Sequence, residues 1–339
     1  MVSACELPPC DDVTGPGWSG APTSSSFPDC DGHFVGSLAS LRIQTVLFEP
    51  RDGDIQRLVR GLGNAVRVAK RHDQLGPVSF AIGDCSGDPS LTPEVFGALE
   101  RSAHDDGVDH LSFEHFGSNL GSAGGHNRLL ENSDETAVLT FNPDAYPSPD
   151  LLLQLAVPLV DKEVGIVEAK QIPLEHPKDF DRTSGETSWA STAAALIRRS
   201  VIEAIGGFDA DAFFLYCDDV DFSWRARLAG FRVTHQPSAR IFHDKRLTTE
   251  GTMVVSDAEI YYAAEAAMML AWKYSHPELA MRLMRGFSSS PLALHRRVAS
   301  RFRARMDEET LPHRLDPDGH VAEFHPDGNY ARHRFSYND

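Results

Sequence analysis

Cysteine is scarce in this chain, with 5 residues among 339. None of them forms a Cys-x-x-Cys pair, so the spacing typical of zinc ribbons and thiol redox motifs is missing. Cys5, Cys10 and Cys30, with His33 nearby, are too irregularly spaced to favour a zinc site over an unstructured leader. We therefore interpret the cysteines as free thiols, as expected in the reducing cytoplasm.

Basic charge and long apolar runs are also lacking. The chain has 32 basic and 49 acidic residues, a formal net charge of −17, so its surface should repel nucleic acid and anionic lipid. No apolar run approaches the roughly 20 residues that span a bilayer, and no signal-peptide pattern occurs, so we expect no transmembrane segment. An anionic nucleotide would have to be met locally, by backbone amides or a metal ion.

Composition divides the chain into three parts. Residues 1–36 are dense in Pro, Gly, Ser and Asp without apolar periodicity, which predicts a disordered N-terminal tail. We place one α/β domain at 37–250 and a helical C-terminal extension with a tail at 251–339. A helix predicted at Asp257–Arg285 has an Ala/Met-rich face. That face could serve acceptor binding, form a homodimer, or pack on its own domain.

Within the central part, runs of strand length alternate with helical patterns. The strand Ile43–Phe48 precedes a helix at Asp54–Arg71 with a continuous apolar face. Strands separated by single helices pair in parallel, so we predict an α/β fold with a mostly parallel sheet flanked by helices. Further strands are predicted at Val78–Ile82, His110–Phe113, Ala137–Phe141, Val164–Ala169, Ala193–Ile197, Arg232–His235 and Ala239–His243, and further helices at Pro93–Ala103, Gly125–Glu131, Ser148–Val160 and Asp218–Ala229.

Ligands of parallel α/β sheets bind beyond the carboxyl ends of the strands, so the residues that follow each strand are the candidates. Asp84 follows a strand in "IGDCSGD". Its carboxylate could accept the imide N–H of a pyrimidine base, but a cap on the next turn is the commoner use of such a residue. The Pro/Gly/Ser-rich stretch Pro173–Trp189 predicts a long loop, and loops of this length often take part in function.

A glycine-rich segment, "GSNLGSAGGHN", follows the third strand. Gly121, Gly124 and Gly125 allow the backbone to approach a ligand closely, and Asn119 and Asn127 offer hydrogen bonds ahead of a helix. The spacing is not that of a dinucleotide-binding loop, which argues against a dehydrogenase. The alternative is a tight strand-to-helix connection.

The segment "LTFNPDAY" ends the fourth strand with a rigid turn. Pro143 holds the turn and places Asn142 and Asp144 at the edge of the sheet. Mg²⁺ or Mn²⁺ accepts such a carboxylate together with diphosphate oxygens. His243, which ends the last strand, is a candidate second metal ligand. In isolation, Asp144 is better explained as an ordinary turn residue.

Three carboxylates crowd the start of one predicted helix in "FFLYCDDVDFSWR". One acidic N-cap is ordinary, but its neighbours add repulsion unless a cation or a proton uses them. Asp221 and Arg225 have the spacing of a helical ion pair, which we interpret as structural. Asp219 is then the candidate general base, with Asp218 beside it.

In this order, the segments "DCS", "NLGSAGGHN", "NPD", "GGFDADAFFLYCDDVDFSWR" and "FH" resemble the inverting family 2 glycosyltransferases of GT-A fold, in particular the rhamnosyltransferase-like branch that builds bacterial surface glycans and natural products. The likeness runs from about Arg42 to His243. It implies a nucleotide-sugar donor with UDP or dTDP, a carbohydrate or small-molecule acceptor, and a Mg²⁺ or Mn²⁺ cofactor. In this chain Asn142 takes the first position of the usual Asp-x-Asp motif.

The resemblance also implies a role for each segment. Asp84 would contact the nucleobase, the Asn119–Asn127 segment and Asn142 would line the donor, and Asp144 with His243 would hold the metal. Asp219 or Asp218 would deprotonate the acceptor hydroxyl. Two alternatives remain open: a nucleotidyltransferase, for which Arg128 is the nearby basic candidate, and a catalytically degenerate sugar-nucleotide-binding protein.

Overall fold

The computed structural model describes residues 37–173, 179–244 and 255–331, which lie in one compact unit, Phe34–Asp339. The predicted tail at 1–36, including the Cys5, Cys10, Cys30 and His33 group, falls outside the described residues. The described cysteines, Cys85 and Cys217, are both buried.

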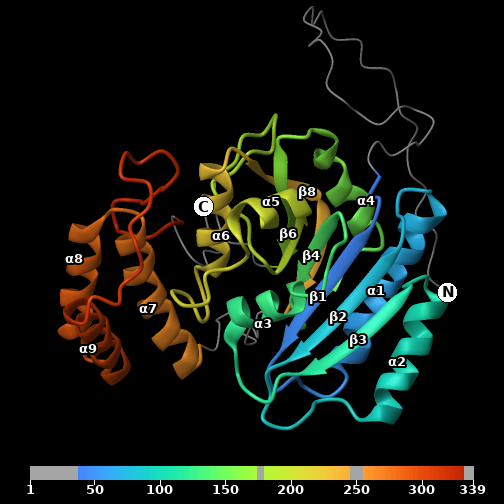
Figure 1. Cartoon of the computed structure of the whole chain (residues 1–339), viewed down its shortest axis with the longest axis horizontal. Coiled ribbons are helices and arrows are strands. Elements are labelled where there is room, and N and C mark those ends of the chain that lie inside the picture. Colours follow the sequence, from blue (N-terminus) through green and yellow to red (C-terminus); the bar gives the residue numbers. More distant parts are fainter. Residues whose placement is uncertain (1–36, 174–178, 245–254, 332–339) are drawn as a thin grey trace, which may run out of the picture. The chain divides into compact units, whose positions relative to one another are not determined.

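A central sheet of eight strands has the order β3-β2-β1-β4-β7-β6-β8-β5 (Figure 1). Its first half is a parallel βα array, because each strand is followed by a helix that returns the chain to the same edge. This half contains β1 (Leu41–Leu47), β2 (Val78–Asp84), β3 (His110–His115) and β4 (Ala137–Phe141), connected by α1 (Asp54–Arg71), α2 (Pro93–Asp105) and α3 (Gly121–Leu130).

The second half of the sheet contains two reversed strands. β7 (Ala194–Arg198) is antiparallel to both β4 and β6 (Val164–Ile172), and the short β5 (Ala145–Pro147) is antiparallel to β8 (Arg232–His243). β6 and β8 pair in parallel. The sheet is therefore mostly parallel, and this confirms the predicted fold class.

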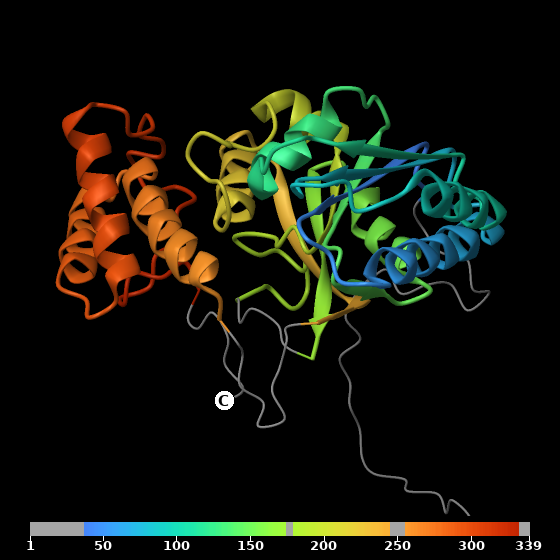
Figure 2. The same ribbon diagram turned by 90° about the horizontal axis from the view of Figure 1, so that it is seen from below.

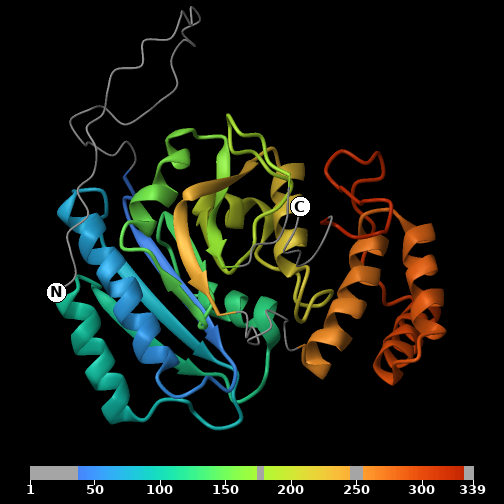
Figure 3. The same cartoon turned by 180° about the vertical axis from the view of Figure 1, so that it is seen from behind.

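Helices cover both faces of the sheet (Figure 2). On one face α1, α2 and α4 (Leu151–Ala156) pack with the inward side chains of the strands in the largest apolar core, and Figure 3 shows α1 and α2 in front of the strands. On the other face a second core joins α3, α5 (Arg199–Ile205) and α6 (Asp218–Leu228) to β6, β7 and β8. Two covered faces explain why the central strands read as continuous apolar runs.

Several predicted elements differ in extent from the observed ones. The two last strands are one strand, β8, whose register shifts between Ala169 and Lys170 of its neighbour. The predicted helix Asp257–Arg285 is two helices, α7 (Asp257–Lys273) and α8 (Pro277–Ser288), because Ser275 takes a left-handed φ of 60° ahead of Pro277. A further helix, α9 (Ala293–Asp307), lies in the polar C-terminal region.

The predicted long loop is only partly described. Residues 174–178 lie outside the described part of the chain, and beyond them Phe180 bridges Thr187 and Glu186 bridges Thr234 of β8. A short turn η1 (Pro158–Val160) ends the α4 segment, which the sequence predicted as one longer helix. No helix in the described parts of the chain is long and apolar enough to cross a bilayer.

The C-terminal helices pack on α6 through an apolar core of their own. α7, α8 and α9 contribute most of it, and α6 inserts Val220 and Trp224. The Trp224 ring meets the Tyr274 ring edge-on with centroids 4.7 Å apart. Phe222 and Ala226 of α6 point instead into the core under the sheet. Helix α6 is therefore buried on two sides.

A buried charge cluster accompanies this packing. Lys273, at the end of α7, places Nζ 2.5 Å from Asp221 Oδ1 and 2.6 Å from Asp209 Oδ2. Arg225 binds the other Asp221 oxygen at 2.7 Å, and the Tyr274 hydroxyl donates to Asp221 at 3.1 Å. Because Asp221 is fully buried, its charge depends on these partners.

Replacing Lys273 with Met should therefore destabilise the fold strongly. The change leaves Asp209 and part of Asp221 without a cation in the interior, which typically costs about 3 to 5 kcal/mol of unfolding free energy. Urea denaturation followed by circular dichroism would measure it. Arg301→Met in α9 removes an ion pair to Glu265 whose arginine is largely exposed, and should cost less than about 1 kcal/mol. Equal losses in the two variants would contradict the prediction.

Candidate active site at the carboxyl edge of the sheet

The parallel strands deliver the predicted site residues to one edge of the sheet. β2 ends at Asp84, β4 ends one residue before Asn142, and β8 ends at His243. β5 runs antiparallel to β8 in a register that pairs Ala145 with His243, so Asp144 lies beside the histidine. Residues 99 positions apart in the chain thereby become neighbours. The topology accounts for this first part of the site.

Asp144 and His243 form a close pair. Asp144 Oδ1 is 3.1 Å from His243 Nε2, and the Asn142 amide nitrogen is 3.4 Å from the same ring nitrogen. The histidine is buried, whereas the Asp144 side chain is 34 % exposed. The carboxylate therefore faces solvent on one side and the imidazole on the other.

Gln171 fixes the orientation of the imidazole. Its side-chain oxygen lies 2.8 Å from His243 Nδ1, and because an amide oxygen can only accept, Nδ1 carries the ring proton in this arrangement. Nε2 then faces the Asp144 carboxylate. A buried histidine whose other nitrogen is held by a side chain is typical of metal ligands.

The donor set matches a hard or borderline divalent cation. One carboxylate oxygen and one neutral imidazole suit Mn²⁺, and they suit Mg²⁺ less well because its preferred ligands are all oxygens. Across the described ranges no three His, Cys, Asp or Glu side chains gather into a metal cage. Two protein ligands suffice where diphosphate oxygens and water complete the coordination, so the residues fit the ion that the sequence predicts.

A basic group lies close to this pair. Arg51, in the connection after β1, binds Asp244 at 2.8 Å and Asp54 at 3.1 Å. The backbone N–H of Asp244 donates to the carbonyl of Asp144. Arg51 is about half exposed, so it adds positive potential beside the pair in a strongly acidic protein.

The second part of the site is the start of α6. Asp218 is buried, and the Ser122 hydroxyl donates to its Oδ2 at 2.8 Å. Burial, together with the charge of neighbouring Asp219, raises the pKa of Asp218 to about 7. Asp219 is more exposed than Asp218. Near neutral pH a proton on Asp218 relieves the repulsion between the two.

The backbone immediately before these carboxylates is strained. Tyr216 and Cys217 have φ values of 68° and 56°, the left-handed region that non-glycine residues avoid. Strain of this kind persists only where the surroundings enforce it, and it is common at functional sites. Here it turns the chain sharply into α6 and brings the Asp218 carboxylate to Ser122 in the first turn of α3.

A chain of hydrogen bonds connects the two parts of the site. The Asn142 N–H donates to Ala193 O at 3.0 Å, and three residues earlier the Ala190 N–H donates to Ser223 Oγ at 3.0 Å. The Ser223 hydroxyl in turn donates to Asp219 O at 2.8 Å. The segment 190–193 therefore ties the strand that presents Asn142 to the helix that presents Asp219.

Asp84 caps a turn in this structure. Its two oxygens accept from the backbone N–H groups of Ser86 at 2.9 Å and Ser90 at 2.7 Å. Burial would raise the pKa of Asp84, but these bonds and those of the serine hydroxyls lower it overall. The carboxylate is fully buried and satisfied by the chain itself. A contact with a nucleobase stays a prediction.

The glycine-rich segment is mostly helix rather than loop, since α3 begins at Gly121. A side chain at Gly121 would place its Cβ 2.2 Å from Phe214 O, and one at Gly125 would come within 2.6 Å of Val46. Gly124 has more room, with Leu120 at 3.2 Å. At Gly121 and Gly125 the close approach is made by the chain's own backbone and side chains, not by a ligand.

The two asparagines of this segment also bind the chain itself. Asn119 Oδ1 accepts the Gly121 N–H at 3.0 Å and so supports the first turn of α3. Asn127 donates to Phe208 O at 2.7 Å and accepts the Phe208 N–H at 2.8 Å, which fixes the turn at Gly206-Gly207. Their predicted donor contacts remain untested.

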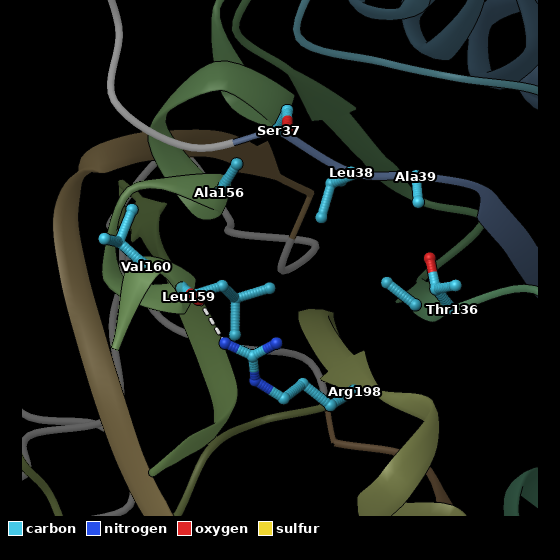
Figure 4. A pocket seen from close by; sticks show the side chains of 9 residues that line it. Ser37, Leu38, Ala39, Thr136, Ala156, Leu159, Val160 and Arg198 are labelled. Carbon is cyan, nitrogen blue, oxygen red and sulfur yellow. Dashed lines mark hydrogen bonds between the residues drawn. The ribbon is translucent and has the colours of Figure 1, made fainter. Parts of the chain in front are cut away.

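A hollow of about 230 Å³ lies at the opposite edge of the sheet (Figure 4). Arg198 reaches across it to the carbonyls of Leu159 and Val164. It is formed by the amino ends of β1 and β4, away from the predicted residues. It therefore contributes nothing to the candidate site.

Sequence reasoning did not find some of the residues that shape the site. Gln171 lies one residue before the end of β6, after Glu168 and Lys170, so its buried polar position does not stand out in the sequence. Ser122 lies inside the glycine-rich segment, where only the glycines and asparagines were considered as candidates. Lys273 ends an otherwise apolar helix that is distant in sequence from α6, and nothing local indicates its partner.

Comparison with known proteins supports the resemblance to GT-A glycosyltransferases. No protein-family model matches the chain. An N-acetylglucosaminyl-diphospho-decaprenol L-rhamnosyltransferase of Mycobacterium tuberculosis is 39 % identical over 61 residues, 18 % of this chain and 20 % of that protein. The rhamnosyltransferase WbbL of Escherichia coli is 31 % identical over 67 residues, 20 % of this chain and 25 % of that protein. The similarity thus spans a quarter or less of these relatives.

Solved structures agree with the fold over most of the chain. A mannosyltransferase of Pyrobaculum calidifontis in complex with GDP-Man and Mn²⁺ aligns with a TM-score of 0.50 and 16 % identity, covering 81 % of this chain and 85 % of that one. GalNAc-T7 with UDP, GalNAc and Mn²⁺ aligns with a TM-score of 0.56 and 11 % identity, covering 80 % and 55 %. The chain has a GT-A-like fold.

The contact between α3 and Phe214 gives a test of the site's framework. Gly121→Ala should destabilise the protein by more than about 2 kcal/mol, because a left-handed φ of 71° already costs an alanine about 1 to 2 kcal/mol and its Cβ displaces Phe214 O. Gly124→Ala, three residues on in the same helix, should be neutral or stabilising by up to about 1 kcal/mol. Urea unfolding of both variants is the measurement. A tolerated Gly121→Ala would refute the packing role.

Proposed function

We propose that this protein is a metal-dependent, inverting glycosyltransferase. It would move a sugar from a UDP- or dTDP-sugar to a hydroxyl of a glycan or natural-product acceptor, as a step in carbohydrate biosynthesis. The observation that carries the proposal is the pairing of Asp144 with an oriented His243 on the edge of a GT-A-like sheet.

Asp144 and His243 are the residues that would hold Mn²⁺ or Mg²⁺. When bound there, the ion would stabilise negative charge on the departing nucleotide diphosphate. Gln171 keeps the imidazole in the tautomer that such a ligand requires. Asn142, in the first position of the Asp-x-Asp pattern, would contact the donor.

Asp219 is the proposed general base. It accepts the proton of the acceptor hydroxyl while the acceptor oxygen bonds to the anomeric carbon. The bond from that carbon to the diphosphate oxygen breaks, and the nucleotide diphosphate leaves with the electron pair. Attack from the face opposite the leaving group inverts the configuration. Asp218, held by Ser122, is a buried neighbour whose raised pKa of about 7 lets it carry a proton near neutral pH.

The nucleotidyltransferase alternative finds less support. It needs a basic residue near the glycine-rich segment for a triphosphate, and Arg128 is already bound to Glu114 at 2.9 Å and to Glu131 at 2.7 Å. The degenerate binding protein stays open until turnover is measured. Pyrophosphate release would support the former, and binding of a sugar nucleotide without turnover would support the latter.

Removing the base should stop transfer without weakening donor binding. Asp219→Asn keeps the shape of the side chain but cannot accept the proton, so kcat should fall at least 10²-fold, within the range known for general bases. Donor affinity, measured by calorimetry with Mn²⁺ present, should change less than about twofold. The proposal for Asp219 fails if the variant keeps full activity.

Removing the proposed metal ligand should, in contrast, weaken donor binding. Asp144→Ala should weaken Mn²⁺-dependent donor binding at least tenfold, since a lost first ligand outweighs the effects known for outer-shell partners. Asp52→Ala, an exposed carboxylate in the connection after β1, removes the same charge and should leave affinity within about twofold. Calorimetric titration with and without Mn²⁺ separates the two. Unchanged donor affinity in Asp144→Ala would count against the metal site.

The donor can be identified by thermal shift. UDP-, dTDP- and GDP-sugars would be screened with and without Mn²⁺. A ligand at one hundred times its dissociation constant adds about 2.7 kcal/mol of stability, which a melting curve resolves.

A further inference from the structure

An exposed apolar row crosses three strands beside the candidate site. Ile172 of β6 pairs in register with Phe242 of β8, and Phe242 pairs with Tyr146 of β5. Residues paired in register project from the same face of a sheet. These three side chains are 40 %, 55 % and 42 % exposed, respectively, so a continuous apolar strip faces solvent.

A pair of cations borders this strip. Lys170 of β6 is in register with Arg240 of β8, two residues before Ile172 and Phe242, and both are exposed. Two residues along a strand return to the same face, so the cations and the apolar row lie together. Within the described residues neither side chain forms an ion pair or a side-chain hydrogen bond. Like charges placed opposite each other are unfavourable without a compensating anion.

This amphipathic strip is continuous with the candidate active site. Phe242 directly precedes His243, and Tyr146 lies two residues after Asp144. Strand alternation turns Gln171, Ile241 and His243 inward and the strip outward. The Tyr146 ring is held in place by α1, since a Cβ on Gly61 would lie 3.0 Å from it.

Bulky apolar side chains flanked by Lys and Arg are the features of a surface that lies in a membrane interface. The rings enter the boundary between headgroups and acyl chains, and the cations reach lipid phosphates. A second copy of this chain fits poorly, because a symmetric contact would bring Lys170 and Arg240 against themselves between two bodies of net charge −17. A local basic strip on so acidic a chain indicates an anionic partner.

The geometry points to this strip, formed by Tyr146, Lys170, Ile172, Arg240 and Phe242, as a docking surface for an anionic phospholipid bilayer. The contact would hold the carboxyl edge of the sheet close to the membrane. This inference goes beyond the proposed sugar transfer, and its test requires neither donor nor metal, so the two can fail separately.

Vesicle sedimentation with the full chain tests the inference. The natural protein should bind vesicles containing phosphatidylglycerol and should bind pure phosphatidylcholine at least tenfold more weakly. The double variant K170Q/R240Q should lose about 25-fold in affinity, about fivefold for each cation near the surface. Phe242→Ser should lose about tenfold. Raising NaCl to 0.5 M should weaken binding of the natural protein further.

Matched variants control for net charge and for exposed apolar area. R101Q/R303Q changes the net charge equally at exposed arginines elsewhere, and Val160→Ser removes an exposed apolar group at the opposite edge. Both should bind as the natural protein does. Melting temperatures verify folding, and Ile172→Ser replaces Phe242→Ser if the latter unfolds.

Three outcomes would overturn the inference. The natural protein does not bind the anionic vesicles, the control variants lose as much affinity as the strip variants, or sedimentation velocity shows a dimer that Phe242→Ser disrupts. The last result would identify a second copy as the occupant of the strip.

Discussion

The buried charge of Asp221 is the constraint on which the rest of the structure depends. A carboxylate with no exposed surface is costly unless cations and donors surround it, and here Lys273, Arg225 and Tyr274 all bind it. Lys273 comes from α7, so satisfying this charge requires the C-terminal helices to pack on α6. Apolar contacts such as Trp224 with Tyr274 then complete the interface. The extension is therefore part of what holds the helix that presents the carboxylates of the candidate site.

The opposite side of the site is held by close backbone approach. Gly121 lets α3 begin directly against Phe214, and the same contact brings Ser122 to Asp218. Asn127 fixes the turn that leads towards this segment. Residues that the sequence suggested for ligand contact thus also hold the framework of the site, and their contacts with a donor stay a prediction. A ligand-binding edge needs such a framework, because groups that are not held in place lose the orientation on which catalysis depends.

The sequence predicts those features of the structure that depend on neighbouring residues better than those that depend on contacts between distant segments. The alternation of strands and helices predicted β1 to β4 and the carboxyl edge, since apolar periodicity is a property of neighbouring residues. The reversal of β7 and the continuity of β8 depend on pairing between distant segments. The pairing of Asp221 with Arg225 was predicted from helical spacing and is confirmed. Lys273, 52 residues further on, was not, because no sequence pattern indicates which buried charges meet.

The acidic residues of the site differ in how their charge is neutralised, and this difference distinguishes their roles. Asp221 has fixed protein cations and is structural. Asp218 is buried against Asp219 with no cation beside it among the described residues, and its raised pKa of about 7 means that it holds a proton near neutral pH. Asp144 lies beside an oriented imidazole and remains partly exposed, an arrangement that suits an exchangeable cation. The chain has a net charge of −17, so an anionic ligand is repelled by the protein as a whole. A cation that arrives with such a ligand and binds Asp144 would offset this repulsion at the carboxyl edge of the sheet.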